Sequence, residues 1–138
     1  MSVSIDIVYE GDLHCQATHV PSGRTLQTDA PVDNGGKGAT FSPTDLVATA
    51  LGSCLLTVMD LVAKRNNLDL RGTRLRVVKE MTTEPPRRIS ALTVRVELPA
   101  GTVVSEVDRV KLEKAAGYCP VKLSLHPDIK VTLEFVYA

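Results

Sequence analysis

A single long apolar segment with a clear helical start constrains the fold of this chain more than any other feature. Ser42-Pro43-Thr44-Asp45 places a capping hydroxyl, a proline at the first helical position and an acid at the third. The following segment, Leu46–Asn66, is apolar on nearly every side until Lys64-Arg65. A helix of this kind has to be covered by protein on all sides, so we expect it to be the central helix of the core.

Strand patterns lie on both sides of this helix. The predicted strands are Val3–Tyr9, Leu13–Val20, Arg24–Thr28, Arg74–Met81, Ile89–Leu98 and Ile129–Tyr137. Two more helices are expected before the last strand. One is capped by Ser105 and runs to about Ala116, and a short one follows Cys119-Pro120. The order βββ-α-ββ-α-α-β predicts a single α+β domain over residues 1–138, with antiparallel sheets around one buried helix.

The composition sets aside several classes of function. Sixteen basic and sixteen acidic residues give zero formal net charge, and no basic cluster suggests a nucleic-acid or membrane-surface partner. The first residues, MSVSIDIVYEGD, lack the basic and apolar regions of a signal peptide. The odd number of cysteines, three, is typical of a reducing compartment. We therefore expect a cytoplasmic protein.

Two cysteines occupy unlike settings. Cys119 directly precedes a proline at the first turn of a predicted helix, where unpaired backbone N–H groups favour the reactive thiolate. Cys54 lies in the middle of the long helix, where burial favours the neutral thiol unless a cation reaches it from another segment. Gly52 and Ser53 leave space and a hydroxyl beside it. From the residues alone, Cys119 is the better candidate for a reactive thiol.

The third cysteine, Cys15, is expected to be structural. It lies on a predicted strand, and its neighbour His14 points to the opposite face of that strand. The spacing of Cys15, Cys54 and Cys119 matches no zinc motif, so we expect no metal site. Nor does the sequence contain a phosphate loop or a dinucleotide fingerprint, so no cofactor is predicted.

Two motifs resemble those of the OsmC/Ohr family. In SPTDLVATALGSC a proline opens a long helix and a cysteine follows eleven positions later, here Pro43 and Cys54. The later YCPVKLSL resembles the second cysteine motif of the family. The Gly-rich stretch before the helix and the closing strand also fit, so the similarity spans nearly the whole chain.

The resemblance implies a thiol-dependent peroxidase that acts on organic hydroperoxides or hydrogen peroxide. The residue matching the attacking thiol is Cys54, which becomes a sulfenic acid. Cys119 then condenses with it to a disulfide, which a dithiol reductant such as a lipoyl group reduces. The implied assembly is an intertwined homodimer with its active sites at the subunit interface. The roles implied for the two cysteines are the reverse of those favoured by the residues alone.

One part of the family pattern differs in this chain. Peroxidases of the family carry a glutamate directly after the motif proline, which helps to hold an arginine against the attacking sulfur. Here Thr44 stands at that position with Asp45 next to it, and Arg24 is the nearest candidate for the arginine. This difference keeps a second hypothesis open: a non-enzymatic dimer that binds a small ligand between its subunits or senses redox state.

Overall fold

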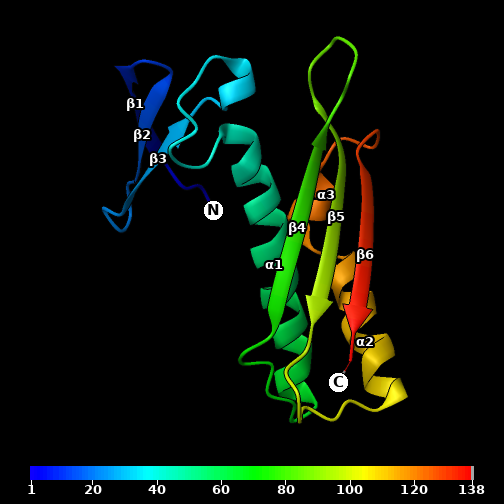
Figure 1. Cartoon of the computed structure of the whole chain (residues 1–138). Helices are drawn as coiled ribbons and strands as arrows, with labels where there is room; N and C mark the ends of the chain where they lie inside the picture. The colour runs from blue at the N-terminus through cyan, green and yellow to red at the C-terminus, as the bar shows by residue number, and fades with distance from the viewer. Residues whose placement is uncertain (138) are drawn as a thin grey trace. The chain divides into compact units, whose positions relative to one another are not determined.

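The computed structural model describes residues 1–137, and their contacts divide the chain into two compact units, residues 1–47 and the remainder from Ala48 onward. The elements follow each other in the predicted order βββ-α-ββ-α-α-β (Figure 1). A short 3-10 turn, η1 (Val32–Asn34), interrupts the Gly-rich loop before the long helix. The α+β class and the element order are therefore confirmed.

The first unit contains an antiparallel meander of β1 (Ile5–Gly11), β2 (His14–His19) and β3 (Thr25–Asp29). Within residues 1–47, all of which the structure describes, the only buried side chains are those of Asp29 and Ser42. The exposed apolar side chains of the three strands are Ile5, Ile7, Val8, Tyr9 and Leu26. This sheet has no apolar core of its own, which is unusual for a stable three-stranded sheet.

The long helix α1 (Pro43–Arg65) begins at the predicted capping motif. The buried residues of the helix form one stripe along it: Ala48, Leu51, Gly52, Leu55, Met59 and Ala63. The expectation that protein covers this helix on all sides is therefore met on one side only within the chain, and Leu61 is 59% exposed. The helix is long and apolar enough to span a membrane, but its buried stripe is typical of a core helix.

The second unit contains a sheet of β4 (Arg74–Met81), β5 (Ile89–Glu97) and β6 (Lys130–Val136), with β5 in the middle. Strands β4 and β5 pair antiparallel, whereas β5 and β6 pair parallel. The prediction of antiparallel strands throughout is wrong for β6. The two helices between β5 and β6 form a crossover that returns the chain to the end at which β5 began, and a crossover of this length permits parallel pairing.

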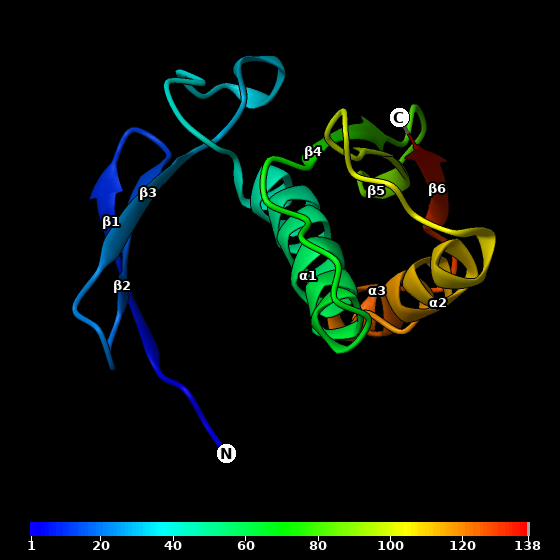
Figure 2. The same cartoon turned by 90° about the horizontal axis from the view of Figure 1, so that it is seen from below.

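Helices α1, α2 (Glu106–Gly117) and α3 (Pro120–Ser124) lie on one face of this sheet (Figure 2). The core between the sheet and the helices is formed by side chains of α1, β5 and α2. Its largest fully buried apolar side chains are Leu51, Leu55, Met59, Leu92, Val94, Val96 and Leu112. The alternation of buried and exposed residues along β5 agrees with the predicted apolar face of that strand.

Contacts from α2 hold the C-terminal end of β6. The guanidinium of Arg109 lies 4.2 Å from the centre of the Tyr137 ring, and the Tyr137 hydroxyl donates a hydrogen bond to Glu113 at 3.1 Å. Burial, and then the negative charge of Glu113, raise the pKa of Tyr137. The tyrosine therefore remains a neutral donor that fixes the last strand against α2.

Candidate active site

Cys54 lies on α1 in the second unit, two residues after Gly52, at which the helix packs closely against β4. A Cβ atom added to Gly52 would lie 2.7 Å from Leu75 Cδ2 and 3.1 Å from Val77 Cγ2, so a glycine permits this close packing. Cys54 itself is half-buried. The backbone of α1 is thus packed against the sheet next to a half-buried cysteine.

The hydroxyl of Ser53 does not serve the thiol as the sequence suggested. Ser53 is exposed, and its Oγ donates to the carbonyl of Ala50 in the same helix at 3.3 Å. The hydroxyl of Thr57 donates to the carbonyl of Cys54 at 3.0 Å. Both hydroxyls bond to the helix backbone, which is common for serine and threonine within helices.

Cys119 lies between α2 and α3 and is completely buried, with 0% of its surface exposed. It is the N-cap residue of α3, and its sulfur accepts a hydrogen bond from the backbone N–H of Lys122 at 3.5 Å. The predicted position of this sulfur at a helix start is therefore confirmed. The helix is only one turn long, so the favourable effect of its N-terminus on a thiolate is small.

Cys54 lies close enough to Cys119 to affect the pKa of its thiol. Burial raises the pKa of Cys119, and the hydrogen bond with Cys54 raises it further. The N–H of Lys122 lowers the pKa, but the two opposing effects outweigh it. Cys119 is thus a protonated thiol that can donate to the sulfur of Cys54, which does not fit the reactive thiolate that its sequence position suggested.

Thr44 and Asp45 belong to the cap of α1. The Asp45 carboxylate accepts a hydrogen bond from the N–H of Ser42 at 2.9 Å, and Ser42 Oγ accepts one from the N–H of Asp45 at 3.1 Å. The hydroxyl of Thr44 lies 3.2 Å from Ser42 Oγ. These contacts form a capping box with aspartate in the acidic position.

Arg24 and Cys15 line a hollow of the first unit. The hollow measures about 550 Å³, and most of its lining is apolar, including Ile5, Ile7 and Leu26. Arg24 lies there in the turn between β2 and β3, and its predicted role as the cation near Cys54 stays a prediction. Cys15 is half-buried and faces this hollow.

A part-buried contact between His14 and Asp29 on the first unit was not predicted from the sequence. His14 Nδ1 lies 2.5 Å from Asp29 Oδ1, and the other carboxylate oxygen accepts a hydrogen bond from the N–H of Ala39 at 2.9 Å. Asp29 is only 3% exposed. His14 is separated from the face of Cys15, as predicted, because neighbouring residues of a strand point to opposite faces.

Across residues 1–137, no three His, Cys, Asp or Glu side chains come close enough together to hold a metal ion. In the second unit, the fold brings two thiols together. Cys54 is the half-buried member of the pair, and Cys119 is the fully buried member, whose pKa is raised.

Residues 35–134 of the chain match the model of a protein family described as OsmC-like protein. Among solved structures, a protein of Psychrobacter arcticus 273-4 named for osmotic stress induction and detoxification response is 38% identical, with a TM-score of 0.89. That alignment covers 95% of this chain and 93% of the other. The chain has no match among curated proteins.

Two more distant structures share the fold. An organic hydroperoxide resistance protein from Legionella pneumophila, also described as a predicted redox protein, is 16% identical with a TM-score of 0.75, over 99% of this chain and 97% of that one. An organic hydroperoxide resistance protein from Elizabethkingia anophelis is 15% identical with a TM-score of 0.77, over 100% of this chain and 97% of that one.

Proposed function

The chain belongs to the family of OsmC-like proteins, and we propose that it is a thiol-dependent peroxidase in which Cys54 and Cys119 carry the reaction. The observation that carries the proposal is the contact between these two thiols. They are 65 residues apart in the sequence, so only the fold can bring them together. Two structures of the same fold are named organic hydroperoxide resistance proteins, which supports a role with peroxides.

In the first step, the thiolate of Cys54 attacks one oxygen of the peroxide and the O–O bond breaks. The other oxygen takes up a proton and leaves as an alcohol, or as water when the substrate is hydrogen peroxide. The sulfur is oxidised to a sulfenic acid and the peroxide is reduced. The partial exposure of Cys54 supports this role, since a peroxide has to reach the attacking sulfur.

In the second step, the sulfur of Cys119 attacks the Cys54 sulfur, the S–O bond of the sulfenic acid breaks and water leaves. The product is a disulfide between the two residues. An external dithiol then reduces it by thiol–disulfide exchange and becomes a disulfide itself. Complete burial suits Cys119 to this second role, because a buried thiol is protected from direct oxidation.

We also propose that the working form is an intertwined cytoplasmic homodimer. The first unit has no buried apolar side chain, and α1 leaves Leu61 exposed and several other apolar side chains, among them Leu56, Val58 and Val62, only half-buried. A second copy offers equivalent apolar surfaces, so both could be covered in a symmetric assembly. The free thiols support a reducing compartment.

The proposed reaction is tested by counting thiols before and after one equivalent of cumene hydroperoxide is added without oxygen. A Cys15→Ser protein keeps the pair intact and contains two thiols. We expect both to disappear and a Cys54–Cys119 peptide to be found by mass spectrometry. Retention of both thiols would contradict the proposal.

A second candidate function is supported by the apolar hollow of the first unit, which could bind a small apolar ligand without any reaction. In that case one equivalent of hydroperoxide would leave the Cys54 and Cys119 thiols unchanged. An apolar fluorescent probe would then bind the Cys54→Ser/Cys119→Ser protein as well as it binds the wild type.

A further inference from the structure

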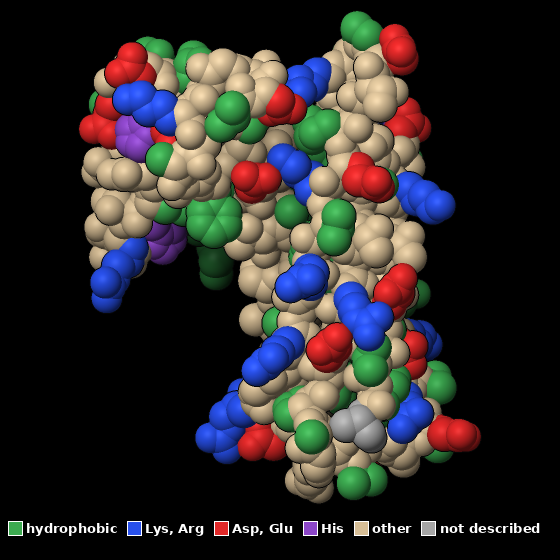
Figure 3. Space-filling view, viewed as in Figure 1, with side chains coloured by type: hydrophobic (Ala, Val, Ile, Leu, Met, Phe, Trp, Pro, Cys, Tyr) green, Lys and Arg blue, Asp and Glu red, His purple; other side chains and the backbone are tan. Residues whose placement is uncertain are grey.

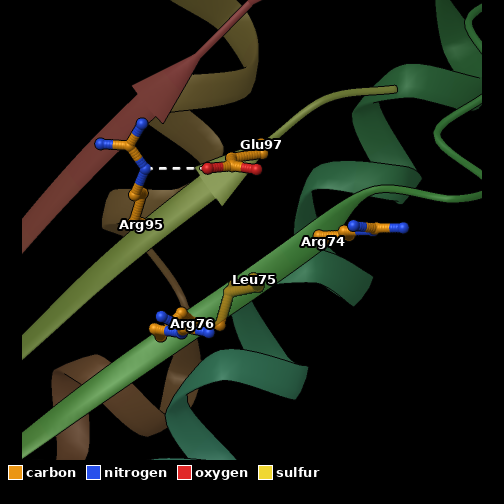
Figure 4. A pocket seen from close by; sticks show the side chains of 5 residues that line it. All are labelled: Arg74, Leu75, Arg76, Arg95 and Glu97. Carbon is orange, nitrogen blue, oxygen red and sulfur yellow. Dashed lines mark hydrogen bonds and ion pairs between the residues drawn. The ribbon is translucent and has the colours of Figure 1, made fainter. Parts of the chain in front are cut away.

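Arginines gather on the exposed face of the second unit's sheet, opposite the helices. Arg74 and Arg76 alternate with Leu75 along β4, so both arginines point to the exposed face. In the strand register, Arg76 is opposite Arg95 and Arg74 is opposite Glu97. The five residues line a hollow of about 520 Å³ (Figure 4).

The charges in this hollow do not cancel. Arg95 Nε donates to Glu97 at 2.9 Å, and Arg95 Nη1 lies 3.9 Å from Glu134. Within residues 1–137, Arg74 and Arg76 have no hydrogen-bond or ion-pair partner for their guanidinium groups. Three guanidinium groups against the carboxylates of Glu97 and Glu134 leave one positive charge in excess.

Without a bound anion, the position of Arg76 opposite Arg95 is electrostatically unfavourable. Residues directly opposite each other in antiparallel strands have Cβ atoms roughly 5 Å apart, and like charges at that distance are unfavourable. Figure 4 shows Arg74 and Arg76 along β4, with the Arg95–Glu97 pair across from them on β5. Glu97 and Glu134 already offset part of the repulsion between Arg76 and Arg95, and an anion bound between the strands would offset the rest.

We propose that this hollow binds a small molecule that carries two linked phosphate groups. A guanidinium group presents a fork of donors that matches phosphate oxygens, and several such groups around one anion are typical of phosphate recognition. One phosphate group lies between Arg76 and Arg95. The second lies toward Arg74, which is two residues and roughly 6.6 Å further along β4.

The size and surroundings of the hollow favour a small molecule over a macromolecule. Nucleic acids bind along an extended track of positive charge. Here Glu97 and Glu134 border the arginines, and Lys, Arg, Asp and Glu side chains are mixed over the part of the surface formed by β4, β5 and β6 (Figure 3). This part of the surface therefore has no extended track of positive charge of the kind that nucleic acids need.

The proposal is tested by titrating the full chain with sodium pyrophosphate in a calorimeter at constant ionic strength. We expect saturable binding of one pyrophosphate per chain. Arg74→Gln and Arg76→Gln should each weaken it by about fivefold or more, since each removes one exposed charge contact. Lys114→Gln removes the same charge from an exposed position on α2 and should leave the binding unchanged.

A parallel titration with ADP shows whether the site recognises a nucleotide or the diphosphate group alone. ADP that binds tighter than pyrophosphate would identify a nucleotide as the source of the diphosphate, and equal binding would identify the diphosphate group itself. The proposal is overturned when pyrophosphate shows no saturable binding, or when Lys114→Gln weakens binding as much as Arg76→Gln does. A glutamate-rich peptide that binds tighter than pyrophosphate would also overturn it and indicate an acidic protein partner.

Discussion

The carboxylate of Asp29 lies 2.5 Å from Nδ1 of His14, directly across the pair of strands β2 and β3. The hydrogen bond with His14 lowers the pKa of Asp29; burial opposes this shift, and the N–H of Ala39 adds to it. Because Ala39 belongs to the Gly-rich loop, the carboxylate holds that loop to the sheet. The charged form of Asp29 therefore stabilises both the meander and the loop before α1.

This contact predicts a dependence of stability on pH. A carboxyl group with a lowered pKa stabilises the fold above its ordinary value of 3.8, and this contribution is lost as the pH falls through the lowered pKa. In thermal unfolding between pH 7 and pH 3, we expect Asp29→Asn to be less stable than wild type at pH 7 and to lose less stability on acidification. Asp12→Asn, which removes an exposed carboxylate, should retain the wild-type profile. Parallel profiles for wild type and Asp29→Asn would contradict the prediction.

The glycines at positions 52 and 117 should respond to alanine in opposite ways. At Gly52 the added methyl would press on Leu75 and Val77, and overpacking costs about 1–3 kcal/mol, more than the gain in helix propensity of about 1 kcal/mol. At Gly117 the added methyl meets nothing within 4 Å, so Gly117→Ala should stabilise the protein by about 0.5–1 kcal/mol. Urea unfolding of both variants measures the difference. Equal effects would mean that α1 is not packed against β4 at Gly52.

Substitution of the three cysteines separates their roles. Cys54→Ser should abolish peroxide consumption. Cys119→Ser should allow one oxidation and leave a sulfenic acid on Cys54 that dimedone traps. Cys15→Ser should react as the wild type does. A dimedone adduct on Cys119 in the Cys54→Ser protein would instead show that the buried thiol is the attacking one.

The cap of α1 and the chemistry of Cys54 can be tested together. Asp45→Ala removes the acceptor for the N–H of Ser42 and should destabilise the protein by about 1 kcal/mol, whereas Asp45→Asn retains an acceptor oxygen. If Asp45 also holds Arg24 near Cys54, Asp45→Asn and Arg24→Ala should both slow the alkylation of Cys54 at neutral pH. The rates are measured in a Cys15→Ser/Cys119→Ser background. Unchanged rates in both variants would remove Arg24 and Asp45 from the proposed site.

The proposed dimer predicts a difference between two neighbouring residues of β1. Ile7 lines the apolar hollow and is 66% exposed, whereas Val8 points to the other face of the strand. Sedimentation at low micromolar concentration should give a dimer for the wild type and for Val8→Asp, and a monomer for Ile7→Asp. A wild-type monomer would contradict the intertwined assembly.

Local signals in the sequence were sufficient for much of the fold. The cap formed by Ser42 and Asp45 and the alternating pattern of β5 are decided by neighbouring residues, and both are present in the structure. The direction of β6 was not predictable, because its pattern is the same in a parallel and an antiparallel pair. The exposed side of α1 was also missed, since composition shows how apolar a helix is but not what covers it.

The candidate site likewise has features that could be predicted from the sequence and features that could not. The position of Cys119 at a helix start followed from the proline after it, but its burial and its contact with Cys54 depend on packing between distant segments. Burial and the contact with Cys54 both raise the pKa of Cys119, whereas its position at a helix start had suggested a reactive thiolate. His14 and Asp29, and likewise Arg76 and Arg95, meet through strand register, which the sequence does not specify.

The parallel pairing of β5 and β6 limits the order in which the chain can assemble. Strands β4 and β5 are joined by residues 82–88 and can pair as soon as both exist, whereas β6 must wait until residues 98–129 have formed the crossover. On the ribosome, β6 emerges after β4, β5 and both helices of the crossover, so one edge of β5 stays open until β6 has been made. An unpaired strand edge of this kind can pair with another chain, so the nascent protein is open to aggregation for as long as β6 is missing.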